Sequence, residues 1–146
     1  MTDLEQLIAD LKAAREPSRE LNTRLMALHW IQGTRHIGAQ EQQDDGSWKP
    51  VMDLVWIDPD GGRWKSTGAL DFTSSIDDAV HLVEAMLPDH QWSTGRSEYM
   101  GVLQPHAVVW RKICDGDFFF ESFNAAMALC IAAVECLARV QGGFDE

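Results

Sequence analysis

Few residues in this chain have the types and spacing that a metal site or a catalytic reaction requires. His81 and Glu84 lie three positions apart in a segment with helical periodicity, so one helical turn could direct both at a single metal ion. A zinc or two-metal site needs at least three ligands, and no nearby segment repeats this pair. The sequence therefore favours an exposed polar pair over a metal site at this position.

Two pairs of aspartates have the spacing of neighbouring calcium ligands, namely Asp58 with Asp60 and Asp115 with Asp117. Neither pair is followed by the distal glutamate of a calcium-binding loop, and Asp and Gly together are typical of tight turns. The remaining histidines occur singly, and the sequence groups no serine, histidine and acid into a nucleophilic site. We therefore predict no catalytic residue, no bound metal and no cofactor.

The charge of the chain is strongly negative and unevenly distributed. A net charge of −11 over 146 residues disfavours direct binding to nucleic acid. No Lys or Arg occurs between Ser66 and Gly95, and the stretch 41–60 has six acidic residues against Lys49 alone. Such a surface either keeps the protein soluble or competes with nucleic acid for a partner with a basic site.

Trp48 and Trp56 lie within the acidic stretch 41–60, and Trp64 follows it closely. Trp56 and Trp110 lie in segments rich in strand-forming residues and are predicted to be core, whereas Trp48 and Trp64 flank a polar hairpin and are predicted to be exposed. Exposed tryptophans beside carboxylates suit a protein interface or a pocket that stacks a base. The candidate interaction residues are Asp44, Asp45, Trp48, Asp53, Asp58, Asp60 and Trp64.

Four segments have apolar residues at helical spacing, and each begins at a candidate N-cap residue. The predicted helices are about 3–14, 18–29, 75–87 and 122–140, with caps at Thr2, Ser18, one of Thr73, Ser74 or Ser75, and Ser122. Strand hairpins are expected at about 51–66 and 107–121, because turn residues separate runs of strand-forming residues there. The polar segment 32–49 is predicted to be a surface loop, and 91–97 to be a strand.

Helices separated by antiparallel hairpins predict an α+β fold with a single domain over 1–146. We expect an α-β-α layered sandwich in which helices cover a small, mainly antiparallel sheet. Cys114, Cys130 and Cys136 include no CxxC pair and are expected to be reduced and mostly buried. No apolar run is long enough to span a membrane and no secretory signal is visible, so we expect a cytoplasmic protein of a bacterial cell.

Three segments together resemble the phage ABA sandwich domain family of small phage and prophage proteins. They are LIADLKAAREPSRELNTRL (7–25), FTSSIDDAVHLV (72–83) followed by Trp92, and ALCIAAVECLA (128–138), and they cover somewhat under half of the chain. The resemblance implies an α-β-α sandwich and a phage or prophage origin, and it brings no catalytic residues to this chain. The stretch 40–70 departs from the usual compact form of the family, so we expect a protein-specific function there.

These observations favour a non-enzymatic phage accessory protein. In this prediction it inhibits a host defence component by presenting an acidic, Trp-containing surface to a basic site on that component. Charge reversal of Asp53, Asp58 and Asp60 is then expected to abolish binding of the partner. Two alternatives stay open, a small-molecule binder or hydrolase with a pocket lined by histidines and acids, and a virion or assembly accessory protein that self-associates.

Overall fold

The computed structural model describes residues 2–59, 69–99, 101–110 and 118–141. In chain order the elements are α1 (Asp3–Ala13), α2 (Arg19–Met26), β1 (Ile31–Gln42), β2 (Trp48–Ile57), α3 (Ile76–Met86), β3 (Gln91–Tyr99), β4 (Val102–Trp110), β5 (Phe118–Glu121) and α4 (Ala125–Gln141). Helices combined with small antiparallel sheets confirm the predicted α+β class. Among the described residues, no helix is long and apolar enough to cross a membrane.

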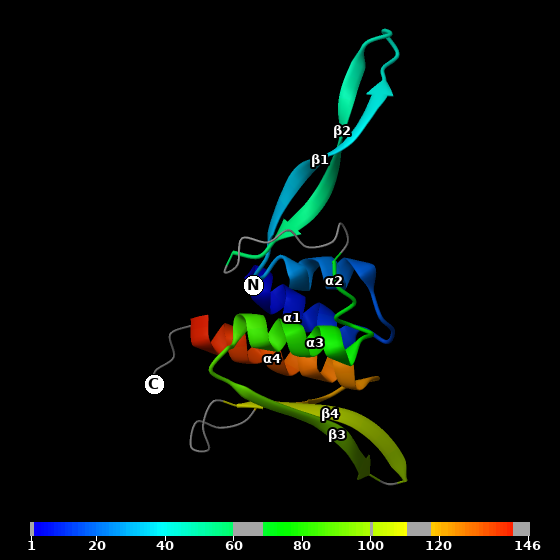
Figure 1. The fold of residues 1–146 in the computed structure, drawn as a ribbon. Helices are drawn as coiled ribbons and strands as arrows, with labels where there is room; N and C mark the ends of the chain where they lie inside the picture. The colour runs from blue at the N-terminus through cyan, green and yellow to red at the C-terminus, as the bar shows by residue number, and fades with distance from the viewer. Residues whose placement is uncertain (1, 60–68, 100, 111–117, 142–146) are drawn as a thin grey trace.

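The helices form layers on the three-stranded sheet β3–β4–β5 (Figure 1). Helix α4 lies on β4 and β5, α3 and α1 both contact α4, and α2 packs against α1. The hairpin β1–β2 extends away from the helices on the side opposite the sheet (Figure 1). Helices cover the sheet as expected, but those in the described segments lie on one of its faces. The layer order is therefore helix, helix, sheet instead of helix, sheet, helix.

Helix α4 explains this order, because it is apolar on almost every side. Eleven of its 17 residues are buried, including the unbroken run Ala126–Val134. A helix that is apolar all round has to be covered all round. The sheet covers one side of α4, while α1 and α3 cover others, and its many alanines allow these neighbours to approach closely.

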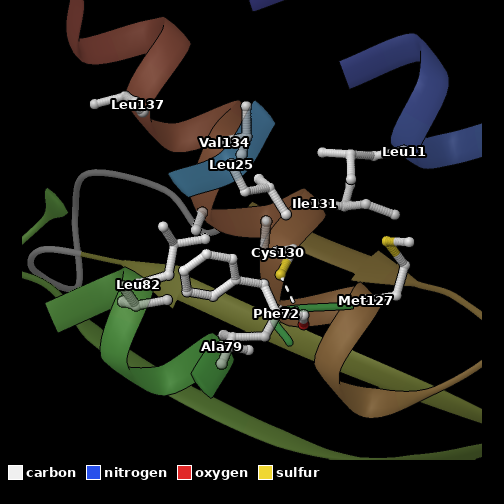
Figure 2. Packing of buried hydrophobic residues seen from close by; sticks show 14 of the residues in the cluster. Leu11, Leu25, Phe72, Ala79, Leu82, Met127, Cys130, Ile131, Val134 and Leu137 are labelled. Atoms are coloured by element: carbon white, nitrogen blue, oxygen red, sulfur yellow. Dashed lines mark hydrogen bonds between the residues drawn. The ribbon is translucent and has the colours of Figure 1, made fainter. Parts of the chain in front are cut away.

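The core continues from α4 into the segment that leads to α3. Phe72 is fully buried and lies among Ala79 and Leu82 of α3 and Cys130 of α4 (Figure 2). The Cys130 thiol donates a hydrogen bond to the Phe72 carbonyl oxygen at 3.3 Å, and burial raises the pKa of this thiol. Cys130 and Cys136 are buried as predicted, and Cys114 lies outside the described residues.

Three of the four predicted helix starts are confirmed, and the fourth is wrong. Thr2, Ser18 and Ser75 each accept a hydrogen bond from the backbone N–H three residues further on, which satisfies an otherwise unpaired donor. At α4 this role belongs to Asn124, whose Oδ1 accepts from the Met127 N–H at 2.6 Å. The predicted cap, Ser122, is still held by the sheet, because its N–H donates to the Pro105 carbonyl oxygen at 3.1 Å.

A buried polar network joins α2, the start of α3 and the start of α4. The Thr73 hydroxyl donates to Asn22 Oδ1 at 2.8 Å and accepts from the Ser18 N–H at 3.0 Å. The Thr73 N–H also donates to Asn22 Oδ1 at 2.9 Å, and Asn124 Nδ2 donates to the Thr73 carbonyl oxygen at 3.0 Å. One threonine thus connects three separate parts of the helical layers.

The prediction of a surface loop over 32–49 is wrong, because most of this segment is strand β1 and the start of β2. Strand β1 has apolar residues at some alternate positions, such as Ile31, Ile37 and Ala39, but charged residues and a shift in register interrupt the alternation by which strands are recognised. Strand β2 pairs with this preceding segment, whereas the hairpin predicted over 51–66 placed its second strand at 63–65, outside the described residues. The strands of the hairpin predicted over 107–121 do pair, with Ala107 opposite Phe120, and 91–97 lies within strand β3.

Candidate functional site: the tip of the β1–β2 hairpin

The turn between β1 and β2 is a compact, hydrogen-bonded structure that presents two aspartates. The Gln43 N–H donates to the Ser47 carbonyl oxygen at 2.7 Å, and Gly46 closes the turn with a positive φ of 87°. Asp45 Oδ1 accepts from the Ser47 N–H at 2.9 Å and from the Ser47 hydroxyl at 2.6 Å. These bonds fix the position of the Asp45 carboxylate, while Asp44 is exposed beside it.

The hairpin tip joins these acids to an exposed aromatic side chain. Trp48, the first residue of β2, is 60% exposed and lies opposite Gln42 in the strand register. Neither Asp44 nor Asp45 forms an ion pair with any of the residues that the structure describes, whereas Glu41 has Lys49 directly opposite. We name the set Asp44, Asp45 and Trp48 the acidic tip.

The Asp45 carboxyl is held in its charged form by the turn. The hydrogen bond from the Ser47 hydroxyl, followed by that from the Ser47 N–H, lowers the pKa of Asp45 below its ordinary value. Because the folded-state pKa is depressed, the charge and its contribution to the turn persist at neutral pH and are lost only as the pH falls through this lowered value. The Asp45 carboxylate therefore stays negative in mildly acidic solution.

Replacement of Ser47 by alanine is expected to raise the pKa of Asp45 back toward its ordinary value. The hydroxyl donor would be lost, while the backbone N–H could still donate, so the return should be partial. A pH titration of the Asp45 side-chain carbon signal by NMR measures both values. An unchanged midpoint in Ser47→Ala would show that the hydroxyl does not stabilise the charge, and Ser93→Ala, at an exposed strand position far along the chain, is the control.

The remaining predicted interaction residues do not gather at the tip. Asp53 lies midway along β2, opposite Arg35, and Asp58 follows the last residue of β2. About 30 Å of extended strand separates Trp48 from Asp58. Asp58 Oδ1 lies 3.9 Å from Nε2 of His29 at the base of the hairpin. Asp60 and Trp64 lie outside the described residues, so the predicted set is divided between the two ends of the ribbon.

Other residues whose side chains could bind a metal or transfer a proton are scattered over the described part of the chain. His81 and Glu84 are exposed on α3, and the His81 ring stacks on Trp30 with centroids 5.6 Å apart. His106 lies on β4 opposite Gly95, and His90 precedes β3. No three His, Cys, Asp or Glu side chains in the described segments are grouped as a metal site would require, and Asp115 and Asp117 fall outside those segments.

Two open hollows on the helical layers also lack the features of a catalytic pocket. One, of about 520 Å³, lies between the start of α1 and the ends of α2 and α4, and Leu4, Arg24 and Gln141 are among its lining residues. The other, of about 440 Å³, surrounds the connection between α1 and α2. No histidine lines either hollow, and the Arg24 guanidinium in the first already pairs with Asp10 at 2.7 Å.

Trp56 is buried as predicted, while Trp110 is half-buried on β4. The sequence interpretation missed strand β1 and, with it, the fact that residues 41–48 stand at the end of a long ribbon. The sequence signal that could have revealed the length of this ribbon lies in β2, where every second residue from Trp48 to Trp56 is apolar.

No family model matches this chain, and no curated protein matches it in sequence. The similarity of three segments to the phage ABA sandwich domain family therefore stays a prediction.

Proposed function

We propose that this protein is a non-enzymatic binding protein that presents its acidic tip to a basic site on a partner protein. One observation supports this most directly: the β1–β2 hairpin extends away from the helical layers (Figure 1). The turn at its end holds Asp44, Asp45 and an exposed Trp48. Charged residues at the end of a projecting ribbon can reach into a concave surface that the helical layers could not enter.

The chemistry of the acidic tip matches this role. Two carboxylates without an ion-pair partner among the described residues retain their full attraction for Lys and Arg side chains, and the net charge of −11 adds long-range steering toward a basic surface. A tryptophan beside them supplies apolar contact area of the kind that dominates interface energies. Binding is therefore expected to be strong at low salt and to weaken as salt screens the charges.

The proposed setting is a phage or prophage protein that inhibits a host defence component. This setting follows from the resemblance of three segments to the phage ABA sandwich family and from the acidic character of the chain. Proteins that act on nucleic acid expose basic sites for phosphate, and an acidic tip can occupy such a site in place of the nucleic acid.

The test compares two variants that remove the same number of negative charges. Asp44→Asn/Asp45→Asn neutralises the tip and keeps an oxygen that can accept from Ser47, whereas Asp89→Asn/Glu98→Gln neutralises two exposed acids elsewhere. Tagged proteins are incubated with bacterial lysate at low and high salt, and retained proteins are quantified by mass spectrometry. We expect the tip variant to retain a stoichiometric partner about tenfold less well than wild type, and the control to retain it normally.

Equal retention by both variants would contradict the proposal, because binding would then depend on total charge or on another surface. A partner retained fully at high salt would also contradict it, since the attraction to a basic site must be screened.

A further inference from the structure

The β1–β2 hairpin contains a bulge with two extra residues about halfway along its length. His36 lies opposite Met52 and Gln40 lies opposite Pro50, so β1 advances four residues where β2 advances two. We name the segment 37–39 the bulge. It divides the hairpin into a proximal part, 31–36 with 52–57, and a distal part, 40–50. Two extended residues span about 7 Å, so the strands are unequal in length at this level and cannot both stay straight.

Backbone preferences at two residues favour the bulge. Gly38 lies within it and has a φ of 83°, in the left-handed region that residues with a side chain rarely adopt. Pro50, on the facing strand, has no N–H to donate, and proline within a sheet occurs mainly at edges and at bulges. Each strand therefore has, near the same level of the ribbon, a residue that suits an interruption of regular pairing.

The proximal part is anchored in the core, whereas the distal part is surrounded by solvent. Val55 and Trp56 are 0% and 4% exposed. From Gly38 to Pro50 every residue is exposed except Gln43, which is half-buried. No described helix or other strand packs on the distal part (Figure 1). Only the ribbon itself can therefore fix the direction in which the distal part points, and the bulge is where its regular pairing is interrupted.

We propose that the bulge is a positioning element that sets the direction of the acidic tip. A regular ribbon would continue along the axis of the proximal part with a smooth twist. A bulge bends its strand and increases the local twist, so the distal part turns away from that axis and also rotates about it. The strands cross about halfway along the hairpin in Figure 1, as expected of a strongly twisted pair.

The distance from the bulge to the tip makes this direction important. Gln40 and Asp45 are five residues apart, which is about 15 Å of extended chain. A change of direction of about 30° at the bulge would therefore move the tip by about 8 Å, which is beyond the reach of a hydrogen bond or an ion pair. A partner that held only the tip could follow this movement. We infer a partner protein that contacts the proximal part or the helical layers as well as the acidic tip; this step rests on the proposed function.

Deletion of Gly38 and Ala39 removes the bulge without disturbing the rest of the register. It places Ile37 opposite Val51 and keeps all the other strand pairs. The expected result is a regular ribbon whose tip turn is intact but points in a different direction. Far-UV circular dichroism and the NMR signals of the turn show whether the hairpin is still formed.

Distances between spin labels measure the direction in the full chain without any partner. One label is attached at Gln42→Cys near the tip, and the other at Ala9→Cys on α1 or Glu84→Cys on α3, all of which are exposed positions. The background is Cys114→Ser, and the two remaining native cysteines are buried. Electron–electron double resonance should show that at least one of the two distances differs by about 5 Å or more between the wild-type ribbon and the deletion variant.

Two substitutions of Gly38 separate its backbone conformation from the size of an added side chain. An added Cβ would have no heavy atom within 4 Å, so either side chain has room. Gly38→Asn should keep the bulge, because asparagine tolerates a positive φ, whereas Gly38→Val should disrupt it. In the lysate assay above, we expect the deletion and Gly38→Val to retain the partner about tenfold less well than wild type, and Gly38→Asn to retain it normally.

Unchanged distances in the deletion variant would overturn the proposal. Displaced distances with normal retention of the partner would also overturn it, because the partner would then follow the tip in any direction. The proposed function fails by a different result, namely normal retention by Asp44→Asn/Asp45→Asn or no partner for the wild type. In either case the label distances still decide whether the bulge sets the direction of the tip.

Discussion

Replacement of Phe72 by alanine is expected to lower the free energy of unfolding by about 3–5 kcal/mol. Phe72 has no exposed surface, and its ring stacks on that of Trp30 with centroids 6.0 Å apart. Removal of the ring would leave a cavity where α3, α4 and the connection from the hairpin meet, and close-packed neighbours can fill it only in part (Figure 2). Urea denaturation followed by circular dichroism measures the loss.

Phe72→Leu provides the matched control, because it shortens the side chain without emptying the site. We expect this variant to lose only about 1–2 kcal/mol. If both variants were destabilised equally and only mildly, Phe72 would not be a central packing residue. The neighbouring side chains would then be able to fill the space left by its ring.

Replacement of Asn22 by leucine is expected to lower the free energy of unfolding by about 2–3 kcal/mol, although leucine is similar in volume. The Thr73 N–H and hydroxyl both donate to Asn22 Oδ1, and both residues are buried. The N–H would lose its acceptor inside the protein, where water cannot replace it, whereas the hydroxyl could turn toward the Ser18 carbonyl oxygen at 3.4 Å. Thermal and urea unfolding of the variant measure the effect.

A double-mutant cycle with Thr73→Val separates this network from general packing. If the two side chains act through their shared hydrogen bond, the double variant should be less destabilised than the sum of the single variants. Additive losses would mean that Asn22 and Thr73 stabilise the protein independently.

The helices were largely predictable from sequence because the signals that start them are local. A Ser or Thr cap and the N–H that it satisfies lie within three residues, so Thr2, Ser18 and Ser75 needed no knowledge of the fold. Ser122 failed as a cap because its backbone is paired with β4, and only the tertiary arrangement reveals that contact. Asn124, two residues later, is an equally suitable cap and is available to the helix.

Strand β1 could not be recognised by the same means. A strand that packs on a core shows regular apolar alternation, but most of β1 lies along a ribbon that leaves the core, and its apolar positions are interrupted by Arg35, Glu41 and a shift in register. Pairing with β2 makes it a strand, and pairing is not a local property of the sequence.

Only part of the candidate site could be predicted, again because strand pairing is not a local property of the sequence. Composition alone selected Asp44, Asp45 and Trp48, which the turn brings together at the tip. It also added Asp58, which the strand direction places at the opposite end of the ribbon beside His29. An acidic composition identifies which residues are charged, whereas the register decides which of them one partner could contact.

The position of α4 in the middle of the fold also bears on the order of events during synthesis. Leu7 and Leu11 of α1 are buried, and Lys12 of the same helix pairs with Glu135 of α4 at 3.4 Å. A ribosome synthesises α4 more than a hundred residues after α1. The apolar side of α1 is therefore exposed to solvent for several seconds or more before α4 can pack against it. Nascent chains stopped before α4 should be open to proteases and chaperones throughout, and protection should appear in a single late step.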